Sequence, residues 1–234
     1  MNIAVIIASG TGQRMGNSIP KQFIHVNNKP IIIYTLEAFE KHPNIDAIEV
    51  VCLDGWHEIL KAYAKQYKIT KLKWIISGGR TGQESIRNGV FNLEKICSED
   101  DMIIIHDGIR PLVDENVLSD VIVKCNQYGN GVTSLPYNEQ IFIKEDENVT
   151  REYIPREQLK RVQTPQAYKF GKLLWAYKKA FEENIGISGS SYTNTMMVDL
   201  GEKLYFAIGS EKNIKLTTKE DLEIFEGLLK LKGN

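Results

Sequence analysis

Small residues and two cations follow the first apolar segment of the chain. The run Ile3–Ala8 has the composition of a buried parallel strand, and Ser9-Gly10-Thr11-Gly12 comes directly after it. Glycines let a backbone approach a ligand closely, so that its N–H groups can face an anion. Arg14 and Lys21 add two positive charges to the same segment. An ordinary strand-to-helix turn would explain the glycines but not both cations, so we expect a loop that binds nucleotide phosphates.

The spacing of these residues differs from two common phosphate-binding motifs. A P-loop needs Gly-x-x-x-x-Gly-Lys-Ser/Thr, and Lys21 lies well beyond the second glycine. A dinucleotide fingerprint opens a helix, which Pro20 prevents here, and this argues against an oxidoreductase. The segment Gly10–Gln22 is therefore predicted to be a long loop. Its spacing resembles the signature loop of nucleotidyltransferases that join sugar or polyol phosphates to a nucleoside monophosphate.

The composition excludes several classes of function. The 234 residues include 29 Lys and Arg against 30 Asp and Glu, which gives no positive field for nucleic acid or an anionic membrane. No apolar run approaches the ~18 residues of a membrane span. The spacing of Cys52, Cys97 and Cys125 argues against a disulfide framework or structural zinc, and Met1 leads into the first strand without a basic leader. We expect a cytoplasmic protein without nucleic-acid or membrane partners.

Strand-like and helix-like segments alternate along the first 130 residues. The expected strands are Ile3–Ala8, Ala47–Leu53, Leu72–Ser77 and Met102–His106, and the expected helices are Pro30–Lys41, Gly55–Tyr67, Gly82–Ile96 and Asp114–Tyr128. Pro30 suits the first position of a helix, and Gly129 suits a helix end. This rhythm predicts an α/β protein with a mainly parallel sheet flanked by helices, in a single domain of residues 1–234.

The pattern changes after residue 131. Further strands are expected at Val132–Pro136, Ile141–Ile143 and Lys203–Ile208, and further helices at Lys169–Glu183 and Thr218–Lys232. Residues 137–160 are too polar for a core, so we expect a projecting β-arm that packs on a second subunit. A solvated surface hairpin is the alternative. The small residues Ser188–Ser191 predict a mobile loop.

Asp107 ends the apolar run Ile103-Ile104-Ile105, at a place where ligands bind in open parallel sheets. A carboxylate there is costly to bury alone, and Mg²⁺ takes one or two carboxylates together with substrate phosphates. We expect Asp107 to hold Mg²⁺; the alternative is that it caps the turn or pairs with Arg110. We expect His106 to hydrogen-bond the backbone, and Arg110 to be a positioning element.

Six motifs in order make the chain similar to a known family over essentially its whole length. They are Ala8-Ser9-Gly10-x-Gly12-x-Arg14-Met15-Gly16, Pro20-Lys21-Gln22, Gly78-Gly79 with Ser85, His106-Asp107-x-x-Arg110-Pro111, Thr164-Pro165-Gln166 and Asn213-Ile214-Lys215. Together they resemble the 2-C-methyl-D-erythritol 4-phosphate cytidylyltransferases and their relatives, the D-ribitol-5-phosphate cytidylyltransferases. The resemblance implies a Rossmann-like nucleotidyltransferase fold and a Mg²⁺-dependent reaction of CTP with a polyol phosphate.

The resemblance also implies roles for individual residues. Arg14, Lys21 and Lys215 would act on the triphosphate, and Asp107 would hold the metal. The remaining nucleotide contacts would come from Ala8, Ser9, Gly10, Thr11, Gly12, Gly78, Gly79 and Ser85, the last three of which would face the cytosine. The acceptor would be bound by Gln140, Arg156, Thr164 and Thr193. Arg151, Lys160 or Arg161 could take the place of Arg156 on the acceptor's phosphate, and Thr164 could instead cap the turn before Pro165. In the family the arm reaches into the partner's site, which implies a homodimer.

Several positions depart from the family's pattern. Gly82 stands where the family usually has arginine, and Arg80 is a nearby substitute. Glu139-Gln140 replaces an Asp-Thr pair, and Thr193-Asn194 replaces Thr-Asp. Because polar sites discriminate strongly between hydroxyl patterns, we expect ribitol 5-phosphate or a similar alditol phosphate, in the synthesis of surface-polysaccharide precursors. Methylerythritol phosphate, a sugar phosphate with another nucleotide, and a non-catalytic nucleotide sensor are the alternatives.

Overall fold

A seven-stranded sheet forms the centre of the computed structural model, which describes residues 1–11, 19–189 and 192–232. Its strands, in spatial order, are β11 (Phe206–Ile208), β7 (Asn130–Pro136), β10 (Lys160–Lys169), β6 (Met102–Asp107), β1 (Asn2–Ala8), β4 (Ala47–Cys52) and β5 (Leu72–Ser77). β10 runs antiparallel to both its neighbours, and the other pairings are parallel. The predicted mainly parallel α/β sheet is confirmed.

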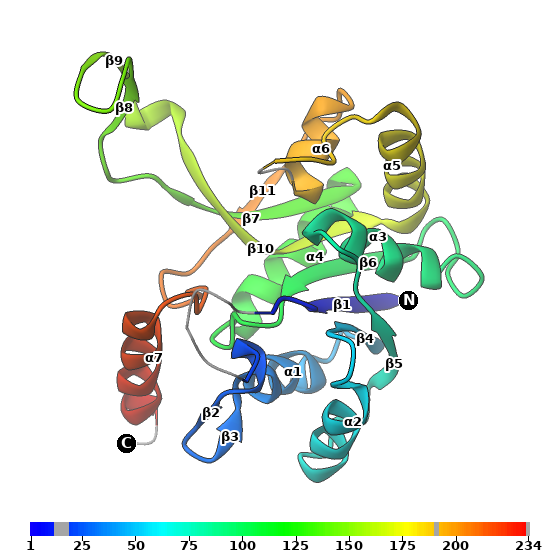
Figure 1. Cartoon of the computed structure of the whole chain (residues 1–234). Coiled ribbons are helices and arrows are strands. Elements are labelled where there is room, and N and C mark those ends of the chain that lie inside the picture. Colours follow the sequence, from blue (N-terminus) through cyan, green and yellow to red (C-terminus); the bar gives the residue numbers. More distant parts are fainter. Residues whose placement is uncertain (12–18, 190–191, 233–234) are drawn as a thin grey trace.

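Helices cover both faces of this sheet (Figure 1). They are α1 (Ile31–Lys41), α2 (His57–Gln66), α3 (Gly82–Asn92), α4 (Glu115–Tyr128), α5 (Phe170–Glu183), α6 (Thr193–Asp199) and α7 (Lys219–Lys232). Side chains alternate along β1, so that Ala4 and Ile6 pack in a cluster with α1, α2 and α4. Ile3 and Val5 pack in a second cluster with α3, α5 and α6. No helix in the described ranges is long and apolar enough to cross a membrane.

The ends of α4 follow local capping rules, whereas the start of α1 differs from the prediction. Asp114 caps α4, where its carboxylate accepts a hydrogen bond from the Val117 amide at 3.0 Å, and Gly129 ends that helix at a φ of 86°. Pro30 was predicted at the first helical position. It is instead the N-cap residue of α1, with an extended backbone, and it pairs with His25 in the small sheet of β2 (His25–Val26) and β3 (Lys29–Pro30).

Among the α-helices and the strands of the main sheet, α6 and β10 were not predicted. Thr164 was considered as the cap of a turn before Pro165, but both residues lie within β10. The pairing of β10 with β7 shifts register between Val162 and Gln166, which accommodates a proline that lacks an amide donor. β11 is shorter than the predicted strand Lys203–Ile208. Part of the predicted Ser188–Ser191 loop, residues 190–191, lies outside the described residues.

A separate hairpin stands away from the main sheet. Strands β8 (Ile141–Lys144) and β9 (Thr150–Ile154) pair antiparallel across the polar turn of residues 145–148, and the short 3-10 helix η3 (Arg156–Gln158) leads back to β10. Figure 1 shows this arm projecting beyond β7 and β10. Phe142 and Tyr153 on it are 56% and 68% exposed, so the arm carries apolar surface that its own subunit leaves uncovered.

One carboxyl group lies inside the hydrophobic core. Glu49 on β4 has no exposed surface, and its Oε2 accepts a hydrogen bond from Asn92 Nδ2 at 2.6 Å. Among the residues that the structure describes, its Oε1 has no hydrogen-bond partner. Burial raises the pKa of Glu49 to about 8, because the core penalises the charged form by more than the Asn92 amide compensates.

Candidate active site

A cavity of about 410 Å³ opens beyond the carboxyl ends of β1 and β6. This is where open parallel sheets bind ligands. The lining residues come from β1, the start of α3, β6 and the turn after it, β10, the start of α6 and the segment before α7. They are Ile7, Gly82, Ile86, Ile105, Asp107, Arg110, Val162, Gln163, Thr164, Gln166, Tyr192, Thr193, Asn194, Thr195 and Lys215.

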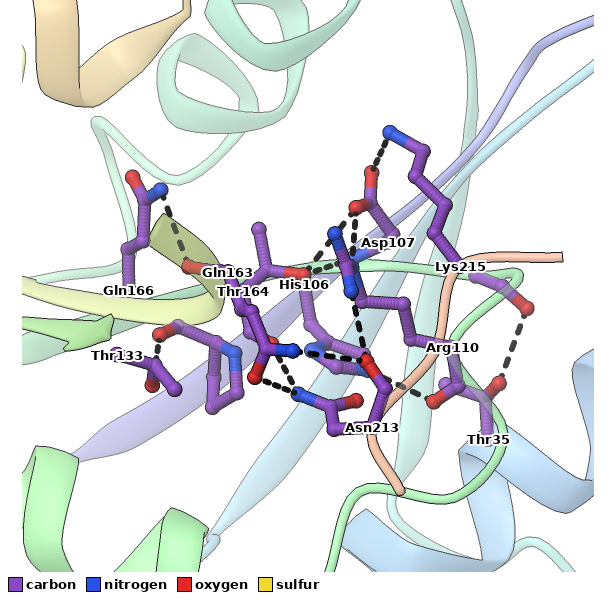
Figure 2. Close-up of polar contacts among 12 residues, drawn as sticks. Thr35, His106, Asp107, Arg110, Thr133, Gln163, Thr164, Gln166, Asn213 and Lys215 are labelled. Carbon is purple, nitrogen blue, oxygen red and sulfur yellow. Dashed lines mark hydrogen bonds and ion pairs between the residues drawn. The ribbon is translucent and has the colours of Figure 1, made fainter. Parts of the chain in front are cut away.

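Asp107 is the centre of the polar contacts in this cavity (Figure 2). Its Oδ2 accepts hydrogen bonds from Arg110 Nε at 2.9 Å and from the Thr164 hydroxyl at 3.3 Å, and its Oδ1 accepts one from Lys215 Nζ at 3.1 Å. Burial raises the pKa of Asp107, but the charges of Lys215 and Arg110 outweigh that effect and hold it at about 2. The carboxylate is therefore ionised at neutral pH. The pairing with Arg110 was the alternative in the sequence analysis, and it is present.

Three hydrogen bonds fix the backbone around Lys215. The Leu216 amide donates to the Ile109 carbonyl at 3.0 Å, and Leu216 itself is fully buried. Arg110 Nη1 donates to the Asn213 carbonyl at 2.7 Å. The buried Asn213 amide donates in turn to the Thr164 carbonyl at 2.7 Å. Residues 108 positions apart in the chain, Asp107 and Lys215, are thereby brought into direct contact.

His106 is buried behind Asp107. Its Nε2 lies 3.1 Å from the Arg110 carbonyl and donates to it, since a carbonyl can only accept. Burial lowers the pKa of His106 to about 4, so the imidazole is neutral at physiological pH. The prediction that His106 hydrogen-bonds the backbone is confirmed.

The predicted base-binding residues lie together beside the end of β1. The Ser85 hydroxyl accepts from Ser9 Oγ at 2.9 Å and from the Gly79 amide at 3.0 Å, and it donates to the Thr81 carbonyl at 2.8 Å. A Cβ atom on Gly78 would lie 2.3 Å from the Ser9 Cβ, so a side chain does not fit there. Ser85 therefore fixes the shape of this loop, and Gly78 lets it approach β1.

Gln22 was not predicted as a site residue, although it belongs to one of the motifs. It is buried, and its amide donates to the Ala8 carbonyl at 2.7 Å and to the Gly10 carbonyl at 3.0 Å. Gln22 thereby anchors the far end of the loop to its beginning, just after Lys21 in the 3-10 helix η2 (Lys21–Phe23). Gly12 and Arg14 lie outside the described residues.

The predicted acceptor residues are divided between two places. Thr164 and Thr193 line the cavity with Asp107, but the buried Thr193 hydroxyl is 2.7 Å from Tyr177 Oη, which donates to Gln83 Oε1 at 3.0 Å. Gln140 and Arg156 line a different cavity of about 570 Å³ on the arm. Within one subunit the structure does not bring these two pairs together.

Sequence reasoning did not name several neutral polar residues of the cavity as site residues. Gln163, Gln166, Asn194 and Thr195 line it with Tyr192. Gln166 belongs to a motif with Thr164, and Asn194 was noted only as a departure from the family's pattern beside Thr193. At Gly82 a side chain would meet open space. Arg80, the suggested substitute for the arginine missing there, is not among the described residues that line the cavity; its side chain is 93% exposed and pairs with Glu84 at 3.6 Å.

A segment of small residues after β1 and a carboxylate flanked by two cations, at the end of a parallel sheet, form the arrangement expected of a nucleotidyltransferase. The sequence model described as "IspD: 2-C-methyl-D-erythritol 4-phosphate cytidylyltransferase" matches residues 2–231, and the chain belongs to this family of enzymes. It is 60% identical to a ribitol-5-phosphate cytidylyltransferase of Lacticaseibacillus paracasei over 99% of each chain. It is 37% identical to a 2-C-methyl-D-erythritol 4-phosphate cytidylyltransferase of Clostridium tetani, over 100% of this chain and 92% of the other.

A solved structure with a similar fold has a name from the same family. The crystal structure of 4-diphosphocytidyl-2C-methyl-D-erythritol synthase from Anaerococcus prevotii matches over 98% of both chains with a TM-score of 0.81, at 22% sequence identity. This likeness confirms the predicted fold class.

Proposed function

We propose that this cytidylyltransferase uses ribitol 5-phosphate as its acceptor and forms CDP-ribitol and pyrophosphate from it and CTP. The observation that carries the proposal is the 60% identity, over 99% of each chain, to a relative named for that acceptor. The cavity is consistent with it, because Asn194 lines it and a side-chain amide can both donate to and accept from hydroxyl groups. Asn194 stands where the family usually has an acid, so this side of the cavity has one negative charge fewer than in that pattern.

The residues of this enzyme would act mainly by placing positive charges around the reacting phosphates. The acceptor's phosphate oxygen attacks the α-phosphorus of CTP in line, an O–P bond forms, and the bond to the β-phosphate oxygen breaks to release pyrophosphate. A phosphate monoester is already a nucleophile at neutral pH, so no general base is needed. Lys21, Lys215 and Arg14 would neutralise the negative charge around the α-phosphorus. The loop after β1 would hold the phosphates through its backbone.

Asp107 is the residue that would hold Mg²⁺. Its ionised oxygens face the cavity and are hard ligands, which this ion prefers. No group of three or more His, Cys, Asp or Glu side chains suited to a metal occurs among the described residues. A single carboxylate nevertheless fits an ion that takes its other ligands from substrate phosphates and water. Such an ion would neutralise charge on the triphosphate.

We propose that the enzyme is a homodimer in which the arm serves the partner's site. The support is the uncovered apolar surface of Phe142 and Tyr153, and the position of Arg156 in a cavity separate from that of Asp107. A mixture of Arg156→Ala and Lys215→Ala chains tests this. Each variant alone should be nearly inactive, and mixed dimers should regain activity at sites that pair an intact arm with an intact core. A mixture that stays inactive would show that the arm acts within its own subunit.

We also propose that the enzyme works in the cytoplasm. Cys52, Cys97 and Cys125 are all free thiols, as expected in a reducing compartment.

The acceptor is tested by pyrophosphate release. Purified enzyme with Mg²⁺ and CTP is given ribitol 5-phosphate, methylerythritol 4-phosphate or glycerol 3-phosphate, and kcat/KM is compared. We expect the highest value with ribitol 5-phosphate. A higher value with methylerythritol 4-phosphate would overturn the acceptor assignment. UTP, ATP and GTP in place of CTP serve as controls for the base, and each should support little turnover.

A further inference from the structure

Tyr192 presents an exposed ring from a fixed backbone. It is 53% exposed and lines the cavity at the start of α6. The Tyr192 amide donates to Thr195 Oγ1 at 2.8 Å, and that hydroxyl donates back to the Tyr192 carbonyl at 3.0 Å. The next residue, Thr193, is buried against Tyr177. The ring is therefore carried by an ordered turn but takes no part in the buried core.

The ring faces the ammonium group of Lys215. Lys215 Nζ lies 5.8 Å from the Tyr192 ring centroid, within the range of a cation–π interaction. The same nitrogen is 3.1 Å from Asp107 Oδ1. The ammonium group thus has one anionic and one aromatic partner, and both line the same cavity.

These two partners differ in what else they can bind. The proposed function assigns Mg²⁺ to the Asp107 carboxylate. A divalent ion bound there would compete with Lys215 for Oδ1 and weaken the ion pair between Asp107 and Lys215. An aromatic face binds an ammonium group but is a poor ligand for a hard cation. Tyr192 therefore keeps its contact with Lys215 when Asp107 has another cation to bind.

We propose that Tyr192 is a positioning residue that holds the Lys215 ammonium group in place in the nucleotide-loaded site. This inference rests on the proposed function, in which Lys215 acts on the triphosphate. The ring is the required part, so Tyr192→Phe should behave like the wild type. Tyr192→Leu keeps an apolar side chain of moderate size but removes the ring, and the half-exposed position should tolerate it.

The test is a double-mutant cycle measured in two ways. Equilibrium binding of CTP with Mg²⁺, without acceptor, is followed by calorimetry, and kcat and the KM values are taken from pyrophosphate release. Tyr192→Leu should weaken CTP binding or lower kcat by about tenfold, the size of a partly desolvated cation–π contact. The same substitution in a Lys215→Ala background should change CTP binding by less than about twofold, because the ring then has no cation to hold.

Tyr128 on α4 provides a matched control. It is 42% exposed and has Lys124 Nζ at 5.8 Å from its ring centroid, but it is not among the residues that line the cavity. Tyr128→Leu should leave both CTP binding and kcat unchanged.

Three results would overturn the inference: wild-type behaviour of Tyr192→Leu, an equal loss in the Lys215→Ala background, or a loss in Tyr192→Phe as large as in Tyr192→Leu. Failure of the proposed function looks different, because the wild-type enzyme would then prefer another acceptor or release no pyrophosphate from CTP, whereas the CTP-binding arm of this test contains no acceptor.

Discussion

The buried carboxyl group of Glu49 should make the stability of the enzyme depend on pH in a way that one substitution removes. The pKa of Glu49 is about 8 in the folded protein against 4.5 as the reference value. Between these pH values the folded state holds one proton more than the unfolded state. The free energy of unfolding therefore falls by about 1.4 kcal/mol per pH unit as the pH rises. Over the whole interval this amounts to about 5 kcal/mol as an order of magnitude.

Glu49→Gln replaces the protonated acid by a neutral group of the same shape. If burying the amide costs free energy that does not depend on pH, this cost shifts the plot of unfolding free energy against pH but does not change its slope. We expect the stability of the variant, relative to the wild type, to rise steadily from pH 4.5 to pH 8 and to level off beyond. Urea unfolding at pH 5, 6, 7 and 8, followed by tryptophan fluorescence, measures this.

The control for this experiment is Glu58→Gln on α2, which makes the same substitution at a side chain that is 83% exposed and pairs with Lys61 Nζ at 2.6 Å on the surface. The stability of this variant should differ little from that of the wild type at all four pH values, because exposed ion pairs contribute little. A stability difference between Glu49→Gln and the wild type that stays constant across the four pH values would refute the reasoning, because Glu49 would then be ionised in the fold.

Three further predictions concern the site itself. Lys21→Ala and Lys215→Ala should each lower kcat by roughly 10²–10³-fold while the circular dichroism spectrum is unchanged, and unchanged kcat would remove either residue from the mechanism. Gly78→Ala should weaken CTP binding about tenfold in calorimetry, since its Cβ would lie 2.3 Å from the Ser9 Cβ, and wild-type affinity would show that the loop adapts. Tyr177→Phe should cost about 1–3 kcal/mol of stability in urea unfolding, because the Thr193 and Gln83 side chains lose a buried partner; an unchanged midpoint would contradict this.

The first half of the fold follows from local sequence patterns. The strands β1, β4, β5 and β6 are short apolar runs between amphipathic segments, and each was predicted within a residue or two. The two-residue strands β2 and β3 were not predicted. β10 was missed because a proline and three polar residues interrupt it, and its pairing with β6 and β7 depends on contacts that are distant in the chain. α6 was missed because a helix of seven residues is too short to show a period.

The residues of the candidate site that belong to family motifs could be predicted from the sequence. Asp107 and Lys215 were assigned to one site through the resemblance to the family, and they are in direct contact. Tyr192 belongs to no motif, and only the folded chain brings its ring to Lys215. The position of Arg156 in a cavity of its own likewise depends on the direction in which the arm leaves the sheet, which no local pattern determines.

The residues proposed to contact CTP and those proposed to contact the acceptor lie on different strands of the sheet and in different parts of the chain. The glycine loop and its supports, from Ser9 to Ser85, come from the first 110 residues, on the β1–β4–β5 side. On the proposed function the acceptor is read by β10, the arm and α6, all of which lie between residues 130 and 200. An ancestral enzyme could thus acquire a new acceptor by changing one contiguous stretch of its gene, while the nucleotide half remained intact.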